Sequence, residues 1–195
     1  LGLHALQHRG QESAGISVSD GENIHTRRGQ GLVSEVFSRD EYLEFNGNQA
    51  IGHVRYTTAG DSGLLNAQPL VFRYTGGQVA VAHNGNLVNA KRLRDQLERQ
   101  GSIFQTNSDT EVVSHLIARA GPPIDHAFQD ALRVIDGAYA LLLMTEKQMI
   151  AAQDPRGFRP LSLGQFENAW VVSSETCALN TICLLYTSDA ADDPT

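Results

Sequence analysis

The sequence has few cysteines, few basic residues and no long apolar run. Its two cysteines, Cys177 and Cys183, are too few and too close together for the disulfide framework of a secreted domain, which favours a reducing, cytoplasmic setting. The longest apolar runs, such as Ala140–Met144, are far shorter than the ~20 residues that cross a bilayer, so we expect no membrane partner. Fifteen basic against 22 acidic residues give a net charge of −7, which argues against a nucleic-acid partner.

The sequence also begins without an initiator methionine or a signal-peptide pattern. We therefore expect the chain to be a fragment of a longer one. Its 195 residues, 41% of them apolar, are enough for one domain with a substantial core. Residues 180–195 show no continuing periodicity and resemble translated adapter sequence, so we expect a domain over 1–179 and an artefactual tail. The alternative is a natural C-terminal extension.

Hydrophobic periodicity predicts strands first, then helices, then strands again. Apolar alternation and turn signals predict strands over 14–19, 23–28, 50–57, 78–83, 138–144, 149–153, 161–163 and 169–174. Helical spacing and end signals predict helices over 89–100, 108–120 and 124–135, the second opened by a capping box at Ser108 to Glu111. This order favours an α+β fold, with antiparallel sheets and helices on segregated faces.

Four polar motifs interrupt this pattern, and each has an ordinary explanation when taken alone. The motifs are LQHRGQESAGI (6–16), GHVRYTTAG (52–60), HNGNL (83–87) and SDTE (108–111). Asn84-Gly85 is a strong hairpin-turn signal, Arg55 could be an exposed strand residue, and Asp109 could simply favour a helix start. His53 and His83 could suggest a metal pair, but no carboxylate or cysteine lies at ligand spacing, so we expect no metal.

Taken together and in order, the motifs resemble the glutaminase domain of class II glutamine amidotransferases, which are N-terminal nucleophile hydrolases. NAQPL (66–70) and SSETCAL (173–179) add to the match, which is closest to the amidophosphoribosyltransferase family and extends from Leu1 to about Leu179. The resemblance implies a four-layer α/β/β/α sandwich of two antiparallel sheets, here lacking its first strand.

The resemblance assigns substrate-binding roles that fit the chemistry of free glutamine. Arg55 would fork two donors onto the substrate carboxylate, Asp109 would accept from its ammonium, and Thr58 would add a hydroxyl contact. The Asn84 side chain and the Gly85 backbone amide would form the oxyanion hole, a role that typically contributes ~100- to 1,000-fold in rate for each donor.

The same resemblance places the nucleophile on a cysteine at the mature N-terminus, with its own α-amino group as the base. Arg9 and Gly10 would lie beside that nucleophile and help to orient it. Residue 1 is Leu1, however, and we expect neither Cys177 nor Cys183 to substitute. The fragment is therefore expected to be inactive.

The complete enzymes of this family use ammonia from glutamine to convert phosphoribosyl pyrophosphate into phosphoribosylamine in purine biosynthesis. The resemblance implies that this second reaction, its Mg²⁺ and, in some members, an iron–sulfur cluster belong to a part of the enzyme outside the fragment, and that the whole enzyme is a homo-oligomer. Two alternatives remain open: a glutaminase domain of a sugar-phosphate or asparagine-forming enzyme, and a non-catalytic glutamine-binding module.

Overall fold

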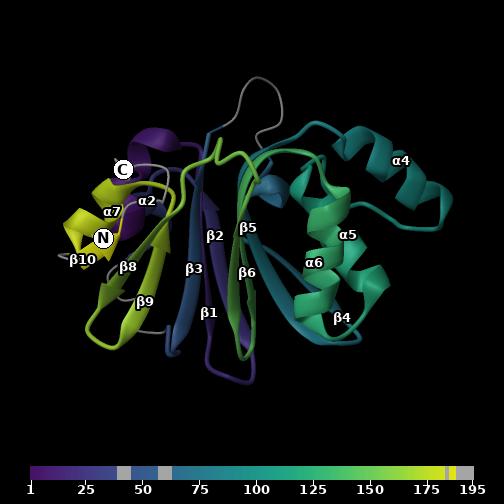
Figure 1. Cartoon of the computed structure of the whole chain (residues 1–195). Helices are drawn as coiled ribbons and strands as arrows, with labels where there is room; N and C mark the ends of the chain where they lie inside the picture. The colour runs from purple at the N-terminus through teal and green to yellow at the C-terminus, as the bar shows by residue number, and fades with distance from the viewer. Residues whose placement is uncertain (39–44, 57–62, 183–184, 188–195) are drawn as a thin grey trace.

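The computed structural model describes residues 1–38, 45–56, 63–182 and 185–187, and its strands form three antiparallel sheets (Figure 1). Sheet A has the order β2-β1-β3, sheet B the order β4-β5-β6-β7, and sheet C the order β10-β8-β9. The strands are β1 (Ser13–Ser19), β2 (Ile24–Gln30), β3 (Gln49–Arg55), β4 (Leu70–Tyr74), β5 (Gly77–Leu87), β6 (Gly137–Thr145), β7 (Met149–Gln153), β8 (Ser162–Phe166), β9 (Ala169–Ser173) and β10 (Leu185–Thr187). The predicted α+β class with antiparallel sheets is confirmed.

Sheet B carries three helices on one face: α4 (Ala90–Arg99), α5 (Thr110–Ala120) and α6 (Ile124–Val134). Successive strand residues point to opposite faces, so Val79 and Val81 of β5 both join the core under these helices. From the helix side, Ile117 and Phe128 are fully buried against the sheet. Among the described residues, no helix is long and apolar enough to span a membrane.

Sheet A packs on the opposite face of sheet B. Ala80 and Ala82, which alternate with the two valines of β5, meet Ile24 and Ile51 of sheet A in a second core. The alanine side chains are short, which leaves room for the isoleucines of sheet A between the two sheets.

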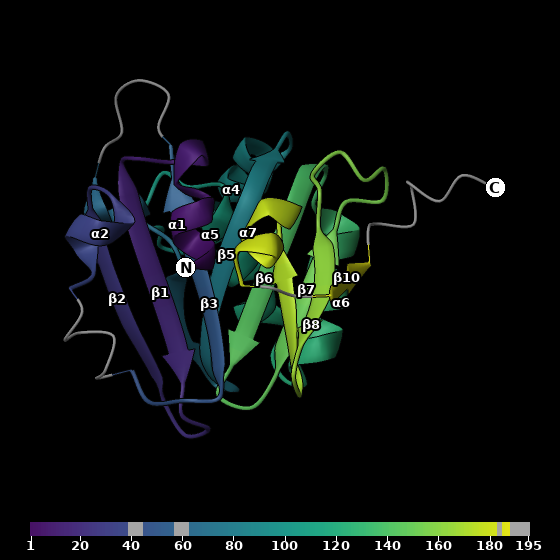
Figure 2. The ribbon, with the colours of Figure 1, turned by 90° about the vertical axis from the view of Figure 1, so that its left-hand side faces the viewer.

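Sheet C lies beside the β3 edge of sheet A, and the short helices α1 (Gly2–Ala5), α2 (Val33–Val36) and α7 (Thr176–Thr181) lie on the outer side of these two sheets (Figures 1 and 2). The chain also forms two short 3-10 helices, η1 (Gln7–Arg9) and η2 (Leu64–Asn66). Val33, Val36 and Phe37 form a small core with Ala14 of β1. The described strands thus divide into three sheets rather than the predicted two, because β3 pairs only with β1 and β9 only with β8.

Three local predictions change in the structure. Asn84-Gly85 is no hairpin turn, because β5 continues through both residues and pairs with β6 as far as Leu87. The capping box at Ser108 is absent: Asp109 is the N-cap of α5, and the Glu111 carboxylate accepts hydrogen bonds from the backbone of residues 105 and 106 instead. Strand β4 was not predicted, and α7 crosses the predicted domain boundary at 179.

Candidate active site

A polar cavity of about 650 Å³ opens where sheets A and B meet the start of α5. Arg55, at the end of β3, lines it together with Asn84 and Gly85 of β5 and Asp109, the N-cap of α5. Four residues that the motifs singled out therefore come from three elements to one cavity. Arg9 lines it as well, from η1.

Arg55 is held by its neighbours on the N-terminal segment. Its Nη1 lies 3.2 Å from Oε1 of Glu12, and its carbonyl accepts a hydrogen bond of 3.1 Å from the Glu12 amide. A β-carbon on Gly10 would lie 2.5 to 2.7 Å from backbone atoms of Arg55, a separation that real contacts essentially never show. Gly10 therefore serves the close approach of two chain segments beside the guanidinium.

Asn84 is oriented by an arginine that can only donate hydrogen bonds. Arg9 Nη2 donates to Asn84 Oδ1 at 3.1 Å, which leaves the Asn84 amide group as the free donor. That amide nitrogen is buried and has no hydrogen-bond partner. A buried donor without a partner is uncommon and costly, so this one is suited to an acceptor brought by a ligand.

Gly85 brings its backbone alongside this donor in a conformation that favours glycine. Its φ is +153°, and a β-carbon there would lie 2.1 Å from the Ala138 carbonyl oxygen and 2.9 Å from His83 Nε2. The position therefore excludes larger residues both by conformation and by space.

Arg9 is fixed in turn by the far end of the sequence. Its Nη1 lies 3.1 Å from Oε1 of Glu175, the N-cap of α7, and His8 Nε2 lies 3.0 Å from Oε2 of the same carboxylate. Glu12 and Glu175 were not predicted as site residues. Both lie inside motifs that the sequence displays, but only the folded chain shows which charged partner each one contacts.

Asp109 is an anchored carboxylate rather than a simple helix cap. Its Oδ2 accepts a hydrogen bond of 2.8 Å from the Leu87 amide, and its Oδ1 lies 3.4 Å from His83 Nδ1. Burial by itself raises the pKa of this carboxyl, but hydrogen bonds from His83, Leu87 and Thr110 outweigh it and lower the pKa below its usual value. The site therefore holds a carboxylate anion beside the cavity at neutral pH.

His53 forms part of the cavity wall as a neutral ring. Its Nε2 donates to the His83 carbonyl at 3.0 Å, and desolvation lowers its pKa to about 4. His53 Nδ1 is buried without a partner. Among the described residues, no group of three or more His, Cys, Asp or Glu side chains could hold a metal ion.

Three other singled-out residues are Thr58, Cys183 and Cys177. Thr58 and Cys183 are outside the described residues. Cys177 is on α7, where burial and the Glu175 carboxylate, 3.5 Å away, raise the pKa of its thiol. A raised pKa disfavours the thiolate, the nucleophilic form, so Cys177 is poorly suited to attack a substrate.

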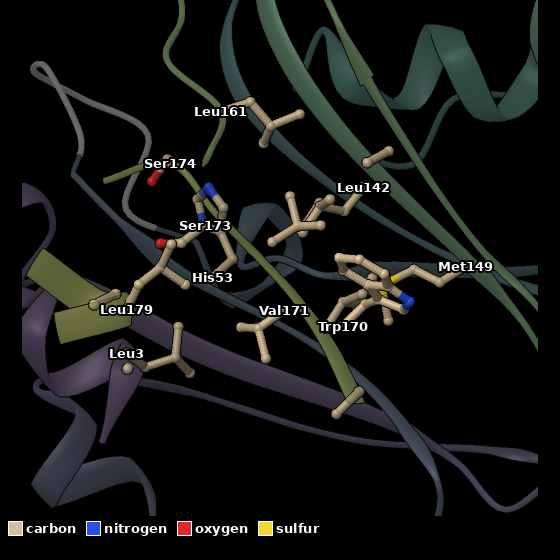
Figure 3. Close-up of a pocket in the computed structure, with 18 of the residues that line it drawn as sticks. Leu3, His53, Leu142, Met149, Leu161, Trp170, Val171, Ser173, Ser174 and Leu179 are labelled. Carbon is tan, nitrogen blue, oxygen red and sulfur yellow. The ribbon is translucent and has the colours of Figure 1, made fainter. Parts of the chain in front are cut away.

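An apolar cleft of about 610 Å³ adjoins the polar cavity (Figure 3). Residues 48–53 along β3 and 168–174 along β9 line it on two sides, and its floor includes Ala82 and Leu142 of sheet B. In Figure 3, Trp170 and Met149 lie next to each other at one end, whereas His53 and Ser173 lie toward the other.

Comparison with known proteins defines the class. Residues 53–181 match the family model of the glutamine amidotransferase domain, and the chain belongs to this family. Its sequence is 55% identical to the amidophosphoribosyltransferase of Bacillus subtilis over 187 residues, which are 95% of this chain and 39% of the relative. It is 54% identical to the chloroplastic amidophosphoribosyltransferase 2 of Arabidopsis thaliana, over 95% of this chain and 34% of that relative.

The fold agrees with these sequence matches. The solved structure of glutamine phosphoribosylpyrophosphate amidotransferase from B. subtilis, complexed with ADP and GMP, superposes with a TM-score of 0.90 at 53% identity, over 95% of this chain and 40% of that one. The chain thus resembles the glutamine amidotransferase domain of amidophosphoribosyltransferases, and it spans between a third and two fifths of the length of these relatives.

Proposed function

We propose that this chain is the glutamine-hydrolysing part of an amidophosphoribosyltransferase. The observation that carries the proposal is the convergence of Arg55, Asp109 and Asn84 on one cavity. Glutamine has a carboxylate, an ammonium and a neutral carboxamide, and the cavity offers a guanidinium, a carboxylate and a buried amide donor. Each group of the ligand thus finds a partner of matching chemistry.

In this proposal Arg55 binds the α-carboxylate and Asp109 binds the α-ammonium, with Thr58 adding a hydroxyl contact. Arg55 and Asp109 come from different layers of the fold and offer opposite charges, which match the two charged groups of one amino acid. The carboxamide then points toward Asn84 and Gly85. A charge-assisted hydrogen bond contributes ~1.5 to 3 kcal/mol, so each charged partner accounts for roughly 10- to 100-fold in affinity.

Catalysis requires a nucleophile that attacks the carboxamide carbon while its oxygen gains negative charge. The Asn84 amide group and the Gly85 N–H stabilise that oxyanion, and Arg9 and Gly10 orient the nucleophile beside them. Cys177 is not that nucleophile, because its thiol pKa is raised and it does not line the polar cavity. We therefore propose that the 195-residue chain alone binds glutamine without hydrolysing it.

The apolar cleft fits the four-layer sandwich that the resemblance implies. An extended segment between β3 and β9 would pair with both open edges at the usual spacing of about 4.8 Å and merge sheets A and C. The result is two sheets instead of three, with helices on both outer faces. We propose that the complete fold contains such a strand and that the nucleophile belongs to it.

The second half of the reaction lies outside the described site. We propose that ammonia passes to a phosphoribosyl pyrophosphate site in another part of the full-length enzyme, where Mg²⁺ and, in some members, an iron–sulfur cluster are bound. Cytoplasmic location and homo-oligomeric assembly belong to the same proposal.

Calorimetry with the purified chain tests the substrate assignment. We expect saturable binding of L-glutamine, no release of glutamate above the buffer rate, and a loss of roughly 10- to 100-fold in affinity in the Arg55→Met variant. Arg73→Met is the matched control, because Arg73 is exposed on β4 and absent from the cavity lining. Equal affinities of the two variants would contradict the assignment, and glutamate release by the unmodified chain would contradict the proposed inactivity.

A further inference from the structure

His83 connects the two parts of the proposed site: Asn84 and Gly85, which would face the carboxamide, and Asp109, which would bind the ammonium. It immediately precedes Asn84 in β5, two residues beyond Val81, where the pairing of β5 with β4 ends. Gln68 lies two residues before β4, and its side-chain Oε1 accepts a 2.7 Å hydrogen bond from the His83 amide. On the other side, the His83 carbonyl accepts from His53. The peptide that leads into Asn84 is thus held by side chains from both directions.

The side chain of His83 reaches the other half of the site. The side chain is 1% exposed, and Nδ1 lies 3.1 Å from the Thr110 hydroxyl and 3.4 Å from Oδ1 of Asp109. Gln68 Nε2 donates to the same hydroxyl at 3.3 Å. Because the Gln68 amide can only donate there, and an ionised Asp109 can only accept, the hydroxyl proton points to the carboxylate 3.5 Å away.

The hydrogen-bond donors of this network point toward the Asp109 carboxylate, directly or through the Thr110 hydroxyl. Donors on Gln68 and His83 face the Thr110 oxygen, and the Thr110 hydroxyl and His83 Nδ1 both face Oδ1 of Asp109. The second carboxylate oxygen is occupied by the Leu87 amide. The Asp109 carboxylate is thus fixed in position by hydrogen bonds from the protein at both of its oxygens.

We propose that His83 is a positioning residue that fixes the Asp109 carboxylate and thereby makes the site selective for ligands with an α-ammonium group. This inference rests on the proposed function, because it takes Asp109 as the ammonium partner. It goes beyond that function by assigning the selectivity to a side chain that acts through Asp109. The lowered pKa of the Asp109 carboxyl, to which the His83 hydrogen bond contributes, agrees with this role.

The competing explanation is that His83 is only a buried polar residue whose contacts stabilise the fold. The two explanations differ in which ligands they affect. Loss of a general packing contact weakens every ligand alike, whereas loss of the Asp109 position weakens only ligands that carry the ammonium. A pair of ligands that differ in that one group therefore separates them.

The experiment measures the affinity of the 195-residue chain for L-glutamine and for its desamino analogue, in which hydrogen replaces the α-amino group. We expect the unmodified chain to prefer glutamine. His83→Phe should reduce glutamine affinity roughly tenfold and change the affinity for the analogue by less than about threefold. His83→Asn keeps a donor near the Nδ1 position and should recover most of the preference.

His115→Phe is the matched control, since this histidine lies on α5 against Phe104 and does not line the cavity. It should leave both affinities unchanged. If His83→Phe does not fold, Thr110→Val removes the same link with little change in volume and should show the same selective loss.

The outcomes separate the inference from the proposed function. Equal weakening of both ligands in His83→Phe and Thr110→Val, or an undiminished preference for glutamine, overturns the role of His83 and leaves the glutamine site intact. An unmodified chain that binds neither ligand, or both equally, overturns the proposed function together with the inference.

Discussion

The polar cavity and the apolar cleft share His53, His83 and Asn84 in their walls, yet they are built from different groups. The polar cavity collects charged and amide side chains from separate elements, each held on one side by a protein partner. The apolar cleft is bounded by two strand edges and aliphatic side chains. Because the two cavities are of similar volume, volume alone does not identify a small-molecule site.

The contrast also explains why the two cavities lie together. A buried donor such as the Asn84 amide needs a solvent-poor setting to act strongly on a developing charge, and the apolar neighbour provides part of that setting. Under the proposed function, glutamine, with two full charges, occupies the polar cavity, and an extended, uncharged chain segment occupies the cleft.

The strongest test of this contrast compares one substitution in each cavity. Asn84→Ala should reduce kcat for glutamate release by roughly 100- to 1,000-fold, because it removes an oxyanion donor. Asn168→Ala makes the same change at the rim of the cleft and should alter kcat less than about threefold. Both are measured in a chimaera in which residues 1–179 replace the equivalent segment of the B. subtilis relative. Similar losses in the two variants would break the contrast.

His53, in the wall that the two cavities share, should make the stability of the protein depend on pH. In the folded chain the His53 pKa is lowered to about 4, whereas the unfolded value is near 6.5, so the unfolded state binds more protons between these values. The contribution of neutral His53 to the free energy of unfolding should therefore be complete above pH 6.5. The free energy of unfolding should fall by roughly 2 to 3 kcal/mol as the pH drops to 4.

Urea unfolding across this pH range measures the effect. His53→Gln should flatten the profile, whereas His126→Gln, at an exposed residue of α6, should not. Protonation of the Asp109 carboxylate lowers the free energy of unfolding only below this pH range, because the pKa of Asp109 is lowered as well. An unchanged slope in His53→Gln would show that another group carries the dependence.

The smallest effect is expected from the cleft. Trp170, the single tryptophan of the chain, is 70% exposed and lines the cleft beside Met149 (Figure 3). Trp170→Ala should leave the dissociation constant for glutamine within about twofold, because no charged contact of the polar cavity changes. Calorimetry measures it. A tenfold loss of affinity would mean that the two cavities act as one site.

Much of the fold was predictable because its signals are local. Helices α4, α5 and α6 and the β6–β7 hairpin show sustained apolar periodicity, and all lie close to their expected ranges. The short helices α1, α2 and α7 span only four to six residues, too few for a helical period to register. At Asn84-Gly85 the turn signal was overridden by pairing with β6, a contact that sequence separation conceals.

The candidate site divides in the same way. Residues that would touch glutamine stand in recognisable motifs, so Arg55, Asn84 and Asp109 could be proposed from the sequence alone; their roles remain predictions. Glu12 contacts Arg55 across 43 positions of sequence, and Glu175 contacts Arg9 across more than 160 positions. No local pattern reveals such partners, because their meaning depends on which elements the fold brings together.

The contact by which Arg9 orients Asn84 has a consequence for the synthesis of the protein. Arg9 is synthesised early, whereas Glu175, its carboxylate partner, follows more than 160 positions later, with Asn84 between them. A nascent chain can complete the inner packing of the two sheets well before it can secure this arginine. Until residue 175 has left the ribosome, Arg9 therefore lacks the carboxylate partner that holds it beside Asn84.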